Sequence, residues 1–450
     1  MEERASGGVL LISVGDVIKR RRVLMSHVGL MAGMEATDVP GSSSPKPGLA
    51  ICGDLMVATG GTKFLAARFK EPSKDDLFIY DCTTSKELQD NQGKDGKSAG
   101  KASSEILASA FSSSGTYFAL TDDNKQLILF RAKPCWECLS IRSVVRRCTS
   151  LIITAAEDKI LVADKSGDVY SFSITEPENA GTIELGHLSL LLDVALSPDD
   201  RYILTADRDE KIRVSLIREP YNIVSFCLGH REFVSRIFVI PNYPGLLLSA
   251  SGDCTLRLWE YRSGKEVHCC QLNTLNKCET TKNEKKYTVS RITYCCEGNY
   301  IAVLYDRIPT VSIFQLDTVA QTLTDKQHIS LKHNGWGIAF EETGGLWILQ
   351  ENKQTPLLFY QPVDGQWQPA SEERGLMKMP KYIHDNWTMF EGSIGKGSCY
   401  QNLYKSSFDN MAVYLQKKQE RILQHKSKRK EPQHESDRQT KKIRTEAPSL

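Results

Sequence analysis

Two histidines that each precede an aspartate are the residues of this sequence best suited to general acid–base chemistry. His187 comes before Asp209, and His230 comes before Asp253. A histidine held by a carboxylate can exchange protons near neutral pH. Both pairs, however, lie in the same repeated context, in which Gly-His opens a series of short apolar runs. We therefore expect each histidine to hydrogen-bond to its aspartate across a repeated fold unit, as a structural pair.

Other patterns typical of enzymes are incomplete in the sequence. Cys135 and Cys138 form a lone C-x-x-C, whereas a zinc site requires a second pair or histidines at ligand spacing. Residues 392–398 superficially resemble a phosphate loop but lack its G-x-x-x-x-G-K-[ST] spacing. A methyl donor would need a Gly-rich turn in an α/β sheet, and the chain shows no βαβ alternation. The sequence thus predicts a binding platform with no catalytic residue, metal or cofactor of its own.

The elements that must position these residues are short β-strands. One series opens at Gly186-His187 and continues through three apolar runs to Val214. A second series opens at Gly229-His230 and closes on Trp259, which we also interpret as structural. A Gly-His opening and a closing Trp, repeating at roughly 40–45 residues, are typical of a WD-repeat propeller blade.

Apolar tetrads at about this period mark out the remaining units. They lie at residues 77–80, 127–130, 169–172, 212–215, 256–259, 311–314 and 357–360. We take each tetrad as the last strand of a blade, and we expect the strand at 49–52 to complete the last blade and close the ring. The sequence therefore predicts an all-β fold, a seven-bladed WD-repeat β-propeller over residues 48–363.

The segments that flank the propeller have different compositions. Residues 1–47 are predicted to be a disordered extension. Residues 364–424 are predicted to dock on or near the propeller through an amphipathic helix and through Trp387 and Phe390. Residues 425–450 read as a disordered basic tail. No apolar run approaches the roughly 18 residues of a membrane span, so no membrane helix is expected.

The C-terminal end carries an excess of positive charge. Between Lys417 and Arg444 there are eleven Lys/Arg and four Asp/Glu, a balance of +7, so the other residues together carry 2 − 7 = −5. Such a tail can neutralise phosphates or direct nuclear import, which predicts a location in the nucleus, with the cytoplasm as a second one. The candidate RNA-binding residues are Lys417, Lys418, Arg421, Lys428, Arg429 and Lys430.

Two charged side chains beside the strand at 212–215 are not explained by the fold. Lys211 and Arg213 alternate with the apolar Ile212 and Val214, so they should point away from the blade interior. An arginine at this rim can bind a partner's carboxylate through two hydrogen bonds, although a solvated charge is an equal alternative.

The sequence resembles a known family, the WD-repeat non-catalytic subunits of the tRNA guanine-N7 methyltransferase. The resemblance runs from about Gly48 to the basic tail. It is carried by residues 117–123, 162–172, 197–201, 204–214, 226–230 and 256–264. Residues 1–47 have no counterpart in the usual family chain.

This resemblance implies that a separate catalytic subunit binds S-adenosylmethionine and methylates a guanosine in the tRNA variable loop, while this chain binds and stabilises that subunit. It also implies that Asp209, Lys211 and Arg213 face the catalytic subunit. Lys165, in a similar turn of the preceding blade, is a weaker candidate. Contact with tRNA would occur through the complex.

Two alternatives remain open at the sequence level. The tetrad Trp259-Glu-Tyr-Arg262 fits the W-x-x-R pattern of substrate receptors that bind the adaptor of cullin-type ubiquitin ligases. The basic tail alone is also compatible with a generic nuclear RNA- or chromatin-binding scaffold.

Overall fold

The computed structural model describes residues 46–70, 76–84, 103–272, 287–370, 378–405 and 410–428. The predictions for residues 1–45, for the basic residues Arg429 and Lys430, and for the rest of the tail lie outside these ranges. The chain divides into two compact units, residues 1–403 and residues 404–450. Each unit is described by itself.

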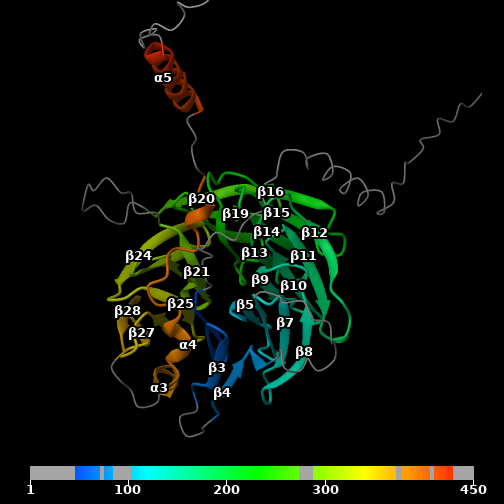
Figure 1. Cartoon of the computed structure of the whole chain (residues 1–450). Coiled ribbons are helices and arrows are strands. Elements are labelled where there is room, and N and C mark those ends of the chain that lie inside the picture. Colours follow the sequence, from blue (N-terminus) through cyan, green and yellow to red (C-terminus); the bar gives the residue numbers. More distant parts are fainter. Residues whose placement is uncertain are drawn as a thin grey trace, which may run out of the picture. The chain divides into compact units, whose positions relative to one another are not determined.

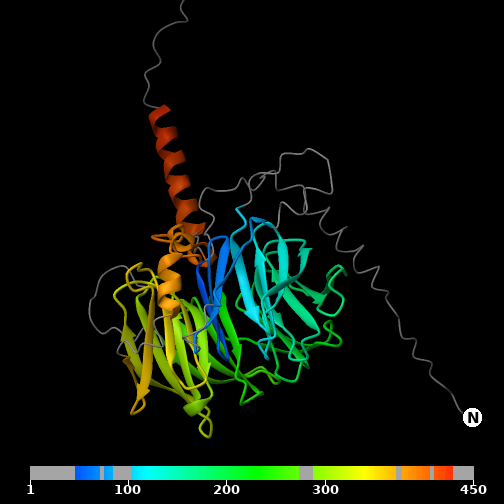
Figure 2. The ribbon, with the colours of Figure 1, turned by 90° about the horizontal axis from the view of Figure 1, so that it is seen from below.

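The first unit contains seven four-stranded antiparallel sheets arranged around a ring (Figures 1 and 2). In every sheet the four strands follow one another in sequence order, so each sheet is one blade. Blade 1 is β1 (Gly48–Cys52), β2 (Leu55–Gly60), β3 (Lys63–Arg68) and β4 (Phe78–Asp81); blade 2 is β5 (Ile106–Phe111), β6 (Tyr117–Asp122), β7 (Gln126–Arg131) and β8 (Glu137–Ser143); blade 3 is β9 (Cys148–Ile153), β10 (Lys159–Asp164), β11 (Asp168–Ser173) and β12 (Thr182–Gly186); blade 4 is β13 (Leu191–Leu196), β14 (Tyr202–Asp207), β15 (Ile212–Leu216) and β16 (Ile223–Cys227). Blade 5 is β17 (Val234–Val239), β18 (Leu246–Ser251), β19 (Thr255–Glu260) and β20 (Lys265–Gln271); blade 6 is β21 (Val289–Cys295), β22 (Tyr300–Tyr305), β23 (Thr310–Asp317) and β24 (Thr322–Ser330); blade 7 is β25 (Gly335–Phe340), β26 (Leu346–Gln350), β27 (Leu357–Val363) and β28 (Gln366–Pro369). The prediction of a seven-bladed propeller is confirmed.

The apolar tetrads are not the last strands of the blades. Six of them lie on third strands, such as β15 and β19, and the tetrad at 77–80 lies at the fourth strand of blade 1. The second and third strands are packed between neighbouring blades and carry the strongest apolar signal. Fourth strands are outer edges, and many of their side chains are exposed. Because such edge strands give a weak apolar signal, the expected boundary at residue 363 missed β28, the last strand of blade 7.

The expected closure of the ring by strand exchange was wrong. Strand β1 pairs with β2 as the innermost strand of blade 1, and blade 7 is completed by its own β28. A seam between two self-contained sheets therefore lies between blades 1 and 7, where β1 packs beside β25. The sequence suggested an exchanged strand because residues 48–52 are separated from the first tetrad by two strands with many alanines.

Two short helices that follow blade 7 cover this seam. They are α3 (Lys378–Asp385) and α4 (Thr388–Glu391). Met379, Ile383, Trp387 and Phe390 are buried in one apolar cluster with side chains of blades 1 and 7. The rings of Trp387 and Phe390 stack on Trp336, with centroids 5.7 and 6.0 Å away. The docking predicted for Trp387 and Phe390 is therefore observed, and we call residues 378–391 the seam cover.

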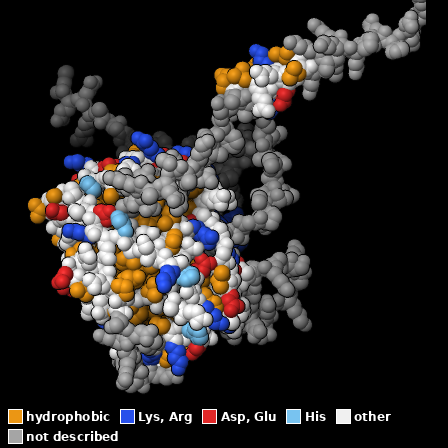
Figure 3. Space-filling view, turned by 90° about the vertical axis from the view of Figure 1, so that its left-hand side faces the viewer, with side chains coloured by type: hydrophobic (Ala, Val, Ile, Leu, Met, Phe, Trp, Pro, Cys, Tyr) orange, Lys and Arg blue, Asp and Glu red, His pale blue; other side chains and the backbone are white. Residues whose placement is uncertain are grey.

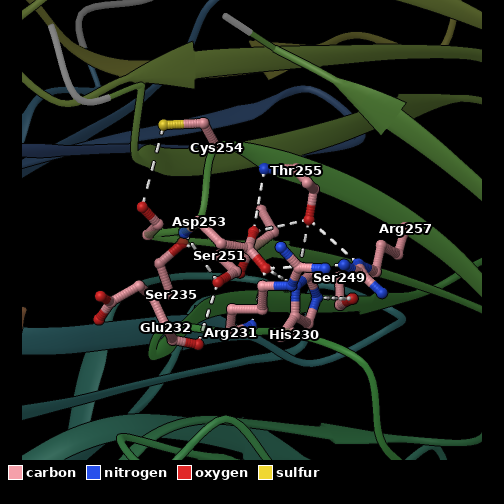
Figure 4. Close-up of polar contacts among 12 residues, drawn as sticks. His230, Arg231, Glu232, Ser235, Ser249, Ser251, Asp253, Cys254, Thr255 and Arg257 are labelled. Atoms are coloured by element: carbon pink, nitrogen blue, oxygen red, sulfur yellow. Dashed lines mark hydrogen bonds and ion pairs between the residues drawn. The ribbon is translucent and has the colours of Figure 1, made fainter. Parts of the chain in front are cut away.

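The histidines of the Gly-His turns are buried in hydrogen-bonded networks. In blade 5, His230 Nδ1 lies 3.1 Å from Asp253 Oδ2, and His230 Nε2 lies 2.7 Å from Ser249 Oγ (Figure 4). The indole of Trp259 donates to the same Ser249 hydroxyl at 2.7 Å. These side chains tie the opening turn to the second and third strands. Their hydrogen bonds are fully used within the fold.

In blade 4 the aspartate partner differs from the expected one. His187 Nδ1 lies 3.2 Å from Asp207, at the end of β14, and not near Asp209. The second nitrogen, Nε2, lies 2.7 Å from Thr205 Oγ1. Asp207 stands two residues earlier in its repeat than Asp253 does in blade 5. His187 therefore hydrogen-bonds to Asp207 and not to Asp209. Asp209 is left exposed in the turn, without this structural role.

The buried His230 predicts a pH dependence of stability. Burial lowers the pKa of His230 from its ordinary value near 6.5, and the hydrogen bond with Asp253 offsets only part of this effect. Below about pH 6.5 the unfolded chain therefore binds a proton that the folded chain does not, and stability falls as pH falls. Between pH 7 and 5, we expect the free energy of unfolding to fall by up to about 1.4 kcal/mol per pH unit more steeply in the wild type than in His230→Gln. Denaturant unfolding would show this, and equal slopes would contradict it.

The second unit contains one helix, α5 (Asn410–Lys428). Met411, Tyr414, Leu415, Ile422 and Leu423 are exposed on it. The docking of this helix on the propeller stays a prediction, as does nuclear import through the tail. No helix in the described ranges has the length and apolarity needed to cross a membrane.

Candidate partner-binding surface

The turn between β14 and β15 presents two of the predicted residues to solvent. Asp209 and Lys211 are both exposed, and the backbone N–H of Lys211 donates to Asp207 Oδ1 at 2.9 Å. Glu210, between them, has a positive φ of 72°, which fixes the tight shape of the turn. Asp207 thus satisfies both His187 and the turn. Asp209 lies 3.8 Å from Arg208 Nε, and Lys211 Nζ donates to the carbonyl oxygen of Asp209 at 3.2 Å, so both side chains stay at the surface, within reach of a partner.

Arg213 is half-buried at the rim, on β15. Its guanidinium donates to the carbonyl oxygens of Gly186 at 3.2 Å and Pro220 at 2.7 Å, and its Nε donates to Ser215 Oγ at 2.9 Å. Burial lowers the pKa of Arg213. Arg213 thus links the last strand of blade 3 to blade 4 and holds the shape of this rim.

The equivalent arginine of blade 5 has a different environment. Arg257 forms ion pairs with Glu266 and Asp253. No carboxylate of the described residues lies within ion-pair distance of Arg213, which faces only neutral oxygens. The charge of Arg213 is therefore uncompensated, and a partner carboxylate could still approach its remaining N–H groups.

Lys165 lies in the corresponding turn of blade 3, between β10 and β11. It is exposed, and its backbone N–H donates to the carbonyl oxygen of Arg147 at 3.1 Å. Partial burial, together with the nearby Arg147 guanidinium, lowers the pKa of Lys165. The described residues place no carboxylate within ion-pair distance of Lys165, so an acidic partner would relieve the repulsion between these two cations.

Backbone contacts join these turns into one surface. Gly167, beside Lys165, accepts a hydrogen bond from the N–H of His187 at 2.7 Å, and the N–H of Arg208 donates to Leu190 at 2.9 Å. Between these contacts Leu188 protrudes fully, with 101 % of its reference area exposed. We call the whole region the blade 3–4 surface, and it consists of Arg146, Arg147, Lys165, Leu188, Arg208, Asp209 and Lys211.

The blade 3–4 surface has the chemistry of a protein interface. It carries five basic side chains and one carboxylate around an apolar side chain that gains nothing from exposure to water. By contrast, the face at the left of Figure 1 shows Lys/Arg, Asp/Glu and apolar side chains interspersed (Figure 3). A partner with an apolar pocket for Leu188 and carboxylates around it would match this surface.

Sequence reasoning missed Arg146, Arg147 and Leu188. They lie in the turns that enter blades 3 and 4, whereas the predicted Lys165, Asp209 and Lys211 lie in the turns between second and third strands. The signal was available, because Leu188 directly follows Gly186-His187 and a leucine there contributes nothing to a hydrogen-bonded turn.

The contact between the two turns depends on Gly167, which predicts an effect of its substitution. Its φ is +94°, and an added Cβ would lie 2.5 Å from the oxygen of Ser189 and 2.8 Å from that of His187. Gly167→Ala should therefore cost about 2–4 kcal/mol of stability and displace the backbone of residues 187–189, which carries Leu188. Gly53→Ala is the matched control, since Gly53 also has a positive φ but its added Cβ has no neighbour within 4 Å. Thermal unfolding of both variants tests this; equal losses would contradict the role of the close contact.

Other candidate sites gain no support from the geometry. Cys135 and Cys138 are exposed, and no group of three potential metal ligands occurs among the described residues. Arg262 of the W-x-x-R tetrad places its guanidinium over the ring of Tyr202, 5.3 Å from the centroid. Lys417, Lys418 and Arg421 are exposed on α5, which also contains Lys428.

Comparison with known proteins places this propeller in a family. The family model described as the tRNA methyltransferase TRM82 WD40 domain matches residues 67–184 and 175–356. The non-catalytic subunit WDR4 of tRNA (guanine-N(7)-)-methyltransferase is 55 % identical over 369 residues in Bos taurus, covering 82 % of this chain and 89 % of the relative. The chain belongs to this family.

Other members of this methyltransferase-subunit family are also similar. The Homo sapiens WDR4 subunit is 55 % identical over 371 residues, covering 82 % of this chain and 90 % of the relative. The Drosophila mojavensis subunit wuho is 30 % identical over 338 residues, covering 70 % and 81 %. These relatives are named as non-catalytic subunits, which confirms the prediction that the chain is not itself an enzyme.

Solved propellers resemble this family member in fold alone. The RRP9 WD40 repeats superpose with a TM-score of 0.55 at 17 % identity, covering 70 % of this chain and 88 % of that one. The structure of U3-55K gives the same TM-score and identity, covering 76 % and 98 %.

Proposed function

We propose that this chain is the scaffold subunit of a tRNA guanine-N7 methyltransferase, and that it binds and stabilises the catalytic subunit through the blade 3–4 surface. The observation that carries the proposal is the combination of Leu188, fully exposed, with Lys165 and Lys211, which are exposed and form no ion pair with a described residue. The names of the relatives support a separate catalytic partner. That partner would bind S-adenosylmethionine.

The mechanism is positional. In blade 4 the His187–Asp207–Thr205 network ties the opening turn to β14, and Asp207 also holds the turn that carries Lys211, so these parts of the surface are fixed before a partner arrives. A rigid surface lowers the ordering cost of binding and can hold the partner's loops in a tRNA-ready arrangement. The exposed cations of α5, among them Lys417 and Arg421, would contact tRNA phosphates once the complex forms.

Substitution of Leu188 tests where the partner binds. Leu188→Asp replaces a solvent-exposed side chain, so the propeller should keep its thermal stability while affinity for the catalytic subunit drops at least tenfold. Leu228→Asp is the matched control, because Leu228 is also exposed, 62 %, in the turn that enters blade 5. Isothermal titration with the purified catalytic subunit measures both. Undiminished affinity of Leu188→Asp would contradict this location of the interface.

A further inference from the structure

The central channel of the propeller contains a polar cavity of about 250 Å³. It is lined by the innermost strands of six blades, from β1 to β21. Four residues of its wall carry hydroxyl groups, namely Thr59, Ser109, Thr149 and Ser150. The charged wall residues are Lys46, Asp193, Arg236 and Arg291.

Asp193 is largely satisfied by the protein itself. Its Oδ1 accepts the hydroxyl of Ser150 at 2.7 Å, and its Oδ2 accepts the backbone N–H of Ile237 at 3.0 Å. The guanidinium of Arg236 lies 3.5 Å from Oδ1 and donates through Nε to the carbonyl of Ser290 at 2.9 Å. The carboxylate of Asp193 thus offsets the charge of Arg236.

Arg291 brings a second guanidinium into the cavity without a second carboxylate. It donates to the carbonyl of Ser290 at 3.0 Å, and no ion pair joins it to a described residue. Burial, and then the neighbouring Arg236, lower the pKa of Arg291 to about 10. Lys46 does not change the balance, because it pairs with Asp306. One positive charge in the channel is therefore uncompensated.

Two residues of the C-terminal segment, Cys399 and Tyr400, lie near the two arginines. Tyr400 is buried, and its ring stacks on Phe233 with a centroid separation of 5.6 Å and an interplanar angle of 8°. Burial raises the pKa values of both Cys399 and Tyr400, so these neighbours of the arginines are neutral at pH 7 and supply no negative charge. The described residues therefore supply no anion to compensate the second guanidinium, and a solute anion could do so.

We propose that the central channel binds a small oxyanion, held by Arg291 and Arg236 and by the hydroxyl of Thr59, which accepts from the N–H of Gly48 and keeps its own proton to donate. Inorganic phosphate and small carboxylates share the required chemistry, since both accept charge-assisted hydrogen bonds from guanidinium groups. A cavity of about 250 Å³ accommodates either with ordered water. The site is separate from the blade 3–4 surface, so the proposal does not depend on the proposed function.

Isothermal titration of the full chain tests the proposal, with inorganic phosphate and acetate added separately against chloride at constant ionic strength. We expect one saturable site with a Kd below about 1 mM for at least one of these anions. Arg291→Met should weaken binding at least tenfold, and Arg291→Lys, which keeps the charge, should weaken it less. Arg218→Met is the control, because Arg218 is exposed outside the cavity. Saturable binding of neither anion, or equal binding to Arg291→Met, would overturn the proposal.

A second measurement needs no substitution, in case Arg291→Met does not fold. Crystals of the full chain soaked in selenate would locate the anion through the anomalous signal of selenium. Signal between the guanidinium groups of Arg236 and Arg291 would support the site. A channel without selenium signal at a concentration that saturates phosphate binding would contradict it.

Discussion

Replacing Lys165 and Lys211 together by glutamate is expected to weaken the complex with the catalytic subunit at least a hundredfold. Both side chains are exposed, and neither forms an ion pair among the described residues, so their replacement should leave the propeller folded. At an interface that faces carboxylates, each reversal removes an attraction and adds a repulsion, and close interfacial charge pairs couple by about 1.5–7 kcal/mol. Titration calorimetry or quantitative copurification would measure the loss.

The control for this variant carries the same charge change elsewhere. Lys265→Glu with Lys326→Glu reverses two exposed lysines on β20 and β24, away from blades 3 and 4. Affinity should stay within about threefold of the wild type, since distant surface charges are screened at physiological salt. If both double variants lose affinity equally, binding depends on net charge and not on the blade 3–4 surface.

Phe390→Ala is expected to lower the free energy of unfolding by about 3–5 kcal/mol. The side chain has no exposed area, and it packs on Trp336 and against Gly60, where an added Cβ would lie 2.6 Å from the Phe390 ring. Because blades 1 and 7 exchange no strand, the seam cover supplies part of the contact that closes the ring. Denaturant unfolding measures the loss. Ile394→Ala, at a side chain 48 % exposed, should cost less than about 1 kcal/mol.

A truncation series tests the seam cover as a whole. A chain that ends after residue 370 lacks the five buried apolar side chains of the seam cover, namely Met379, Ile383, Trp387, Met389 and Phe390, and also the buried Tyr400. At about 1.5–3 kcal/mol each, their loss approaches the full stability of a typical protein. We expect this chain to fail to unfold cooperatively and a chain that ends after residue 405 to remain folded. Equal stability of the two chains would show that the ring closes without the seam cover.

The repeated strands were predictable from the sequence because every blade must meet the same packing requirement. Apolar residues must alternate on strands packed between neighbouring sheets, and turns must recur at a similar period. For this reason six of the seven apolar tetrads coincide with third strands. Outer strands such as β28 have an exposed face, so their composition resembles that of a loop, and the boundary of blade 7 was set too early.

Ring closure and the detailed site depend on contacts that local sequence does not specify. The packing of Trp387 and Phe390 on Trp336 joins segments far apart in the chain. His187 pairs with Asp207 and not with Asp209 because of the position of the turn relative to the end of β14. This displacement explains why Asp209 does not pair with the histidine as the sequence had suggested.

Methyl transfer from S-adenosylmethionine to bulk tRNA tests the central claim most directly. The assay compares this chain alone, the candidate catalytic subunit alone, the coexpressed pair, and the pair containing the Lys165→Glu and Lys211→Glu chain. We predict no activity for this chain alone, strong activity only for the wild-type pair, and activity of the variant pair near that of the catalytic subunit alone. Full activity of the catalytic subunit without this chain, or of the variant pair, would contradict a scaffold that acts through the blade 3–4 surface.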